Sequence, residues 1–136
     1  QIAFLEFERK IHDERKKGEI PLNKICEFWM EIQKESLGPI FQYDEEYKYF
    51  WSYIPHFIHS PFYVYSYAFG DCLVNSLYGI YKSGKIDNFE TKYIDMLKLG
   101  GTKHHKEMLQ PFNLSIKDEA FWQSGLDVIS GYIDKI

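Results

Sequence analysis

The sequence has little cysteine and no long apolar run, and each shortage excludes a class of protein. Its 136 residues include only two cysteines, Cys26 and Cys72, which are too few for a disulfide framework. No apolar stretch approaches the roughly 18 residues that a membrane-spanning helix needs. We therefore expect a reduced, cytoplasmic protein with no membrane partner, in which both thiols are buried as small hydrophobic groups.

The chain also lacks a basic stripe and any run of alternating apolar and polar residues. Its formal net charge is −4 and its pI is near 5.7, which argues against a nucleic-acid partner. No segment shows the period-two alternation of a half-buried strand. Hydrophobic residues make up 45% of the sequence, which is enough for a core. The composition therefore predicts a single helical unit over residues 1–136.

Helical periodicity covers most of the chain and predicts an all-α fold with six to seven helices. Apolar residues recur at three- and four-residue steps from Leu22 to Ile32, the period of a core-facing stripe. Ser60 and Pro61 are typical of a helix start, and the longest helix is expected at about 61–83. Further helices are expected at 2–17, 21–36, 43–54, 86–101, 103–110 and 115–136.

The expected helix at 61–83 is apolar on most sides. Beside its main apolar face runs an aromatic stripe composed of Tyr63, Tyr67, Val74, Tyr78 and Tyr81. Another face carries only small side chains, which let a second backbone approach closely: Ala68, Cys72, Ser76 and Gly79. We therefore expect this helix to be central and enclosed on most sides by the others.

The stretch IPHFIHSPFYVYSYAFG, residues 54–70, crowds two histidines and three tyrosines together. Its aromatic side chains are either core residues with satisfied hydroxyl groups or one wall of an active site. Tyr65 stands at the end of the small-residue face, so we expect it beside a cleft. The residues alone leave both interpretations open.

This stretch closely resembles a block of oligoendopeptidase F, a zinc metallopeptidase family related to thimet oligopeptidase. The family pattern reads Ile-Pro-His-Phe-Tyr, a short gap, then Phe-Tyr-Val-Tyr-Gln-Tyr-Ala-x-Gly. Two more blocks match in the right order. QIAFLEFE at 1–8 resembles the family's Gln-x-x-Phe-x-Glu-Phe-Glu, and 93–129 carries Leu-x-x-Gly-Gly and Phe-Trp-x-x-Gly-Leu-x-x-Ile. The resemblance implies a fragment of a larger helical metallopeptidase catalytic domain.

The resemblance also implies zinc-dependent hydrolysis of peptide bonds in short peptides. In this family a His-Glu-x-x-His helix and a later Glu hold the zinc. A His and one or more Tyr from a distant segment donate hydrogen bonds to the oxyanion of the tetrahedral intermediate. His56 and Tyr65 match that His and Tyr, so they are the catalytic candidates. Tyr63, Tyr67 and His59, the last expected in a loop, are candidates for substrate binding.

One departure from the family is large, because the chain has no His-Glu-x-x-His motif. The nearest match, HHKE at 104–107, has the wrong order and spacing and is typical of an exposed polar patch. We therefore expect a C-terminal fragment that holds no zinc, is inactive alone and has the N-terminal zinc-bearing part as its partner. Apolar groups at the cut surface are expected to favour self-association. The alternative is a non-enzymatic helical interaction module in which the tyrosines only pack.

Overall fold

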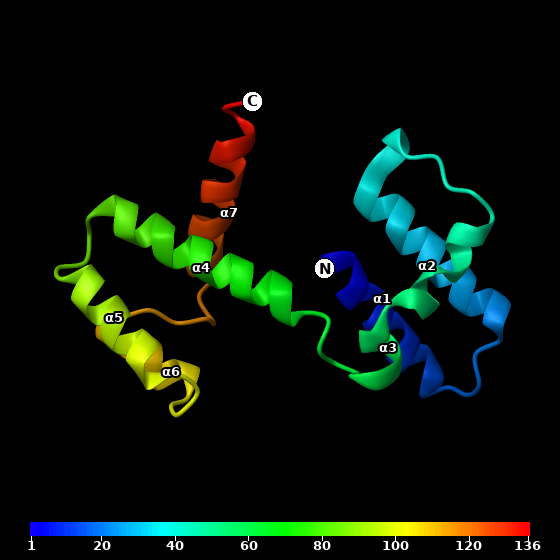
Figure 1. The fold of residues 1–136 in the computed structure, drawn as a ribbon, viewed down its shortest axis with the longest axis horizontal. Helices are drawn as coiled ribbons and strands as arrows, with labels where there is room; N and C mark the ends of the chain where they lie inside the picture. Colours follow the sequence, from blue (N-terminus) through cyan, green and yellow to red (C-terminus); the bar gives the residue numbers. More distant parts are fainter. The chain divides into compact units, whose positions relative to one another are not determined.

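The computed structural model describes all 136 residues and contains only helices and their connections (Figure 1). The α-helices are α1 (Ile2–Arg15), α2 (Leu22–Leu37), α3 (Pro55–His59), α4 (Ser66–Ser83), α5 (Phe89–Leu99), α6 (His105–Leu109) and α7 (Glu119–Ile133). The 3-10 helices are η1 (Gly38–Ile40), η2 (Glu46–Tyr53) and η3 (Gln110–Phe112). The prediction of an all-α fold with six to seven helices is confirmed. None of these helices combines the length and the apolar character needed to cross a membrane.

The chain divides into two compact units, Gln1–Ala68 and Phe69–Ile136. The first contains α1, α2 and α3, and the second contains α5, α6, α7 and most of α4. That residues 1–136 form a single helical unit, and that this unit is the C-terminal portion of a larger catalytic domain, both stay predictions.

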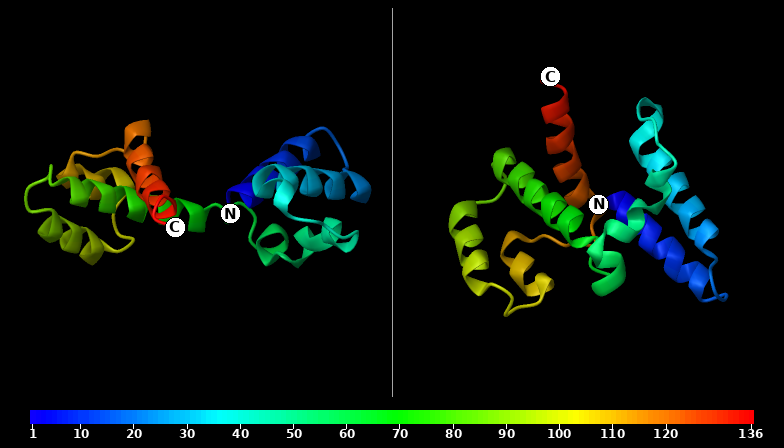
Figure 2. Two further views of the ribbon diagram at one scale, coloured as in Figure 1. Left: turned by 90° about the horizontal axis from the view of Figure 1, so that it is seen from above. Right: turned by 45° about the vertical axis from the view of Figure 1, so that its right-hand side comes forward.

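The first unit is built on α1 and α2, which pack against each other (Figure 2). Its buried cluster consists of Phe7, Phe28, Trp29 and Ile32. Trp29 is 0% exposed, and its Nε1 donates a hydrogen bond to the backbone oxygen of Tyr47 at 3.1 Å. Because a buried indole N–H needs a partner, this bond ties η2 to α2. The predicted stripe is confirmed at Trp29 and Ile32, whereas Leu22 at its start is exposed.

The second unit has its own buried cluster, which consists of Leu77, Phe89, Met96, Leu109, Phe112 and Phe121. Within this unit α7 crosses α4 at small residues (Figure 1). A Cβ atom on Gly79 would lie 2.9 Å from the backbone oxygen of Ser124, and one on Gly125 would lie 2.5 Å from Ser76 Oγ. Ser76 is 0% exposed. The predicted small-residue face is therefore confirmed as the place where another backbone approaches closely.

The longest helix, α4, begins at Ser66, five residues later than the sequence predicts. Phe62 has a φ of 65°, a left-handed conformation that an α-helix cannot contain. The backbone N–H and the hydroxyl of Ser66 both donate to the carbonyl oxygen of Tyr63, at 3.2 Å and 2.8 Å. A neighbouring prediction also needs correction. Most of the segment 43–54 forms a 3-10 helix, η2, rather than an α-helix, and a separate short helix, α3, begins at Pro55 directly after it.

The aromatic stripe of α4 is exposed in this chain. Tyr67, Val74, Tyr78 and Tyr81 each have at least 42% of their surface exposed. The prediction that other helices enclose α4 on most sides is wrong for this stripe. α7 packs on the small-residue face and on Phe69, and the core cluster packs on the side of Leu77. A largely apolar hollow of about 410 Å³ lies between this stripe and α5.

Candidate functional site

His56 lies in α3, and its imidazole ring meets two of the tyrosines that the sequence singled out. The ring stacks on Tyr63 with centroids 5.8 Å apart and planes inclined by 5°. It meets Tyr67 edge-on, with centroids 6.3 Å apart and planes at 90°. Two aromatic neighbours limit the orientations open to the half-buried imidazole. The structure thus brings together three of the five predicted site residues.

Tyr65 lies against α1. Its ring, 45% exposed, lines a hollow of about 310 Å³ together with Phe62 and residues of α1. His59 is exposed and is the last residue of α3, so the prediction that it belongs to a loop is wrong. The five predicted residues therefore fall into a group around His56, a position beside α1 for Tyr65, and an exposed helix end for His59.

A buried carboxylate on α1 holds the segment that carries these tyrosines. Glu8 is 5% exposed, and its Oε1 accepts a hydrogen bond from the backbone N–H of Phe62 at 2.6 Å. The imidazole of His12 stacks on the Phe62 ring with centroids 4.3 Å apart. Sequence reasoning missed Glu8 and His12. The signal that could have found Glu8 is its place beside Phe7 on the core-facing side of α1, where a carboxylate needs a partner.

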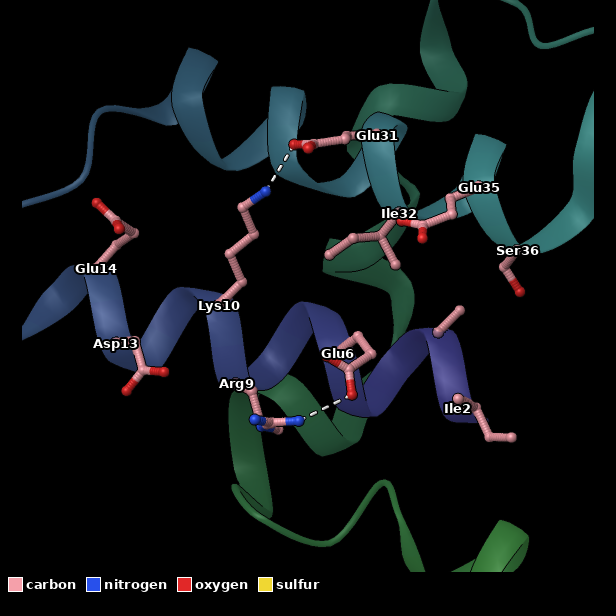
Figure 3. Close-up of a pocket in the computed structure, with 11 residues that line it drawn as sticks. Ile2, Glu6, Arg9, Lys10, Asp13, Glu14, Glu31, Ile32, Glu35 and Ser36 are labelled. Atoms are coloured by element: carbon pink, nitrogen blue, oxygen red, sulfur yellow. Dashed lines mark hydrogen bonds and ion pairs between the residues drawn. The ribbon is translucent and has the colours of Figure 1, made fainter.

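Another hollow of the first unit lies between α1 and α2 and does not include the predicted site residues (Figure 3). It measures about 630 Å³ and is lined mainly by charged side chains. Lys10 Nζ lies 2.6 Å from a carboxylate oxygen of Glu31, and the hydrogen bond from Lys10 lowers the pKa of Glu31. Arg9 pairs with Glu6 at 3.0 Å. Exposed ion pairs of this kind contribute little to stability and give the hollow the character of a solvated surface.

The three-dimensional arrangement of the chain offers no metal centre. Among residues 1–136, no three His, Cys, Asp or Glu side chains gather in a way that could hold a metal ion. The exposed histidines of the HHKE segment play structural parts: His104 Nδ1 accepts the N–H of Lys106 at the start of α6, and its ring lies 3.9 Å from that of His105. The pKa of His105 is lowered mainly by desolvation. The charges of His104 and Lys117 lower it further. Both cysteines are free thiols, with Cys26 buried and Cys72 half-buried.

Comparisons with known proteins agree with the resemblance seen in the sequence. An oligoendopeptidase F homolog from Borreliella burgdorferi is 33% identical over 137 residues, which cover 100% of this chain and 23% of that protein. Oligopeptidase PepF from Bacillus subtilis is 35% identical over 115 residues, covering 81% of this chain and 16% of that protein. The plasmid-encoded oligoendopeptidase F from Lactococcus lactis subsp. cremoris is 24% identical over 137 residues, covering 100% of this chain and 22% of that protein.

The chain spans less than a quarter of the length of these relatives. No solved structure matches it. The predicted resemblance to oligoendopeptidase F is confirmed by the three relatives, and a family profile agrees with it over almost the whole chain. Since the profile of peptidase family M3 matches residues 1–128, the chain belongs to peptidase family M3.

Proposed function

We propose that this chain is the C-terminal part of the catalytic domain of a zinc-dependent, cytoplasmic oligoendopeptidase that hydrolyses short peptides. The observation that carries the proposal is the family match over residues 1–128. The names of the relatives, oligoendopeptidase F and oligopeptidase, support a peptide substrate. The net charge of −4 argues against nucleic acid as a partner.

The residues of this chain do not fit a zinc site, so the zinc ligands of the proposed enzyme lie outside residues 1–136. Zinc held there would polarise the scissile carbonyl and would lower the pKa of a bound water to about 7. The part of the protein that supplies those ligands is the first partner of this chain. The exposed stripe of Tyr67, Val74, Tyr78 and Tyr81 is a surface that this partner could cover.

This chain contributes hydrogen-bond donors for the oxyanion of the tetrahedral intermediate. His56 donates a ring N–H, and its orientation is held by Tyr63 and Tyr67. Tyr65 donates its hydroxyl from an exposed ring. Both donors are aimed at charge that appears only after the water has attacked, so they lower the barrier without tightening substrate binding. Tyr63, Tyr67 and the exposed His59 contact the peptide.

A non-enzymatic interaction module is the second candidate, and the exposed aromatic stripe of α4 is the observation that favours it. In that case the stripe binds a partner and the tyrosines near His56 serve only as packing. The isolated chain would then self-associate through the same apolar surface.

Peptide hydrolysis by the full-length protein separates the two candidates. We expect cleavage of a short quenched-fluorescent peptide, loss of cleavage on treatment with a zinc chelator, and recovery when zinc is restored. The isolated 1–136 chain, tested in parallel, should bind no stoichiometric zinc and cleave nothing. Hydrolysis that survives complete metal removal contradicts the proposal, as does a full-length protein that cleaves no short peptide.

A further inference from the structure

The tyrosine segment leaves α3 through a residue in an unfavourable backbone conformation. Phe62 has a φ of 65°, in the left-handed region that bulky side chains rarely adopt. It directly precedes Tyr63 and stands three residues before Tyr65. The backbone dihedral angles at position 62 therefore set the direction in which both tyrosines leave the turn. Such a conformation persists only where the surroundings hold it.

Two side chains of α1 hold Phe62 in this conformation. The N–H of Phe62 donates to Glu8 Oε1 at 2.6 Å, a short hydrogen bond. The ring of Phe62 stacks on His12, with centroids 4.3 Å apart and planes inclined by 22°. His12 Nε2 in turn lies 3.8 Å from Glu8 Oε1. The backbone and the side chain of one residue are thus both fixed by α1.

The burial of Glu8 makes a purely electrostatic surface role a poor explanation. Its side chain is 5% exposed, whereas Glu14 on the same helix is 37% exposed and pairs with Lys17 in solvent. A buried carboxylate is costly unless hydrogen bonds satisfy it. Here the closest donor is the backbone N–H of a strained turn, 54 residues away in the sequence.

We propose that Glu8 is a positioning residue, which fixes the turn at Phe62 and thereby aims the Tyr65 hydroxyl at the oxyanion of the reacting peptide. This inference rests on the proposed peptidase function. Glu8 does not touch the substrate. It acts through one backbone hydrogen bond, which requires an acceptor oxygen at the right distance from the α1 backbone.

Three substitutions at Glu8 in the full-length protein separate the effect of side-chain length from the effect of charge. Glu8→Gln keeps the length and an acceptor oxygen but removes the charge. Glu8→Asp keeps the charge but is one methylene shorter, so its carboxylate cannot stay 2.6 Å from the Phe62 N–H without movement. Glu8→Leu removes the acceptor altogether. Glu14→Ala is the matched control, because it removes a carboxylate of the same helix that is 37% exposed and pairs with Lys17.

We expect Glu8→Leu and Glu8→Asp to lower kcat about 10- to 100-fold with little change in KM, since a small misplacement of donors can cost that much. Glu8→Gln should stay within about 3-fold of wild type, as should Glu14→Ala. Hydrogen exchange at the peptide containing Phe62 should be faster in the Asp and Leu variants than in the Gln variant. Where Glu8→Leu does not fold, the comparison of Asp with Gln carries the test.

Wild-type kcat in Glu8→Asp, or a Gln variant as impaired as Asp, would overturn the positioning role. A rise in KM at constant kcat in the Asp and Leu variants would overturn it too, because it would place Glu8 in substrate binding. Failure of the proposed function is a distinct result, visible as the absence of peptide hydrolysis by the wild-type protein itself.

Discussion

The crossing of α7 over α4 provides a test of packing in the second unit. Gly125→Ala adds one methyl group at the point of closest approach. The new Cβ would lie 2.5 Å from Ser76 Oγ, 2.8 Å from the backbone nitrogen of Ser76 and 2.9 Å from the backbone oxygen of Cys72. Two of these atoms belong to the backbone of α4, so rotation of a side chain cannot make room. The two helices must move apart.

The size of the effect follows from two opposing contributions. Overpacking a well-packed site costs about 1–3 kcal/mol of unfolding free energy. Alanine is favoured over glycine inside a helix by roughly 0.5–1 kcal/mol, which offsets part of that cost. Gly131, in the same helix, is a matched control, because a Cβ there would meet no atom within 4 Å. Gly131→Ala should therefore show only the favourable contribution.

Urea denaturation of both variants, followed by circular dichroism, measures the difference. Because the helix-propensity contribution is similar in the two, Gly125→Ala should be less stable than Gly131→Ala by about 1–3 kcal/mol. Relative to wild type, Gly131→Ala should be slightly stabilised. Equal stability of the two alanine variants would refute the close approach of α7 to α4.

Two further predictions concern a helix cap and a phenol. Asp118→Ala should lower the unfolding free energy by about 1 kcal/mol in thermal denaturation, because the Asp118 carboxylate caps α7 by accepting the N–H of Ala120 at 3.0 Å. Asp118→Asn should retain most of the stabilisation from the cap. Glu90 accepts a hydrogen bond from the hydroxyl of Tyr81 at 2.9 Å, and this bond raises the pKa of Tyr81. The stabilisation from this pair is therefore present below about pH 10, the pKa of an unfolded tyrosine, and is lost as the pH rises through the raised pKa. Ultraviolet titration should find a lower Tyr81 midpoint in Glu90→Gln, and identical curves would count against the bond.

Periodicity predicted the helices well because it reports which face of each helix is apolar. The stripe around Trp29 and the small-residue face around Ser76 both pack as expected. The predicted start of α4 was wrong, because a tertiary contact overrides the local signals. Ser60 and Pro61 are good local signals for a helix start, but the chain turns at Phe62 because of contacts with α1, and local signals do not report such contacts.

The candidate site was predictable in part. The resemblance to oligoendopeptidase F drew attention to His56 and its neighbouring tyrosines, and the structure does bring His56 together with Tyr63 and Tyr67. The role of Glu8 could not be read from spacing, since it depends on one hydrogen bond across 54 residues. Exposure of the aromatic stripe was also missed, because a helical wheel cannot tell which faces other elements leave uncovered.

The most direct test of the account is the turnover number of Tyr65→Phe in the full-length protein. This substitution keeps the ring and removes only the hydroxyl. We predict a fall in kcat of about 100- to 1000-fold, with KM, zinc content and folding nearly unchanged, because a donor to the oxyanion acts only in the transition state. Tyr63→Phe and Tyr67→Phe, whose rings contact His56, are the controls. Turnover that is unchanged in Tyr65→Phe, or that falls further in either control, would contradict the assignment.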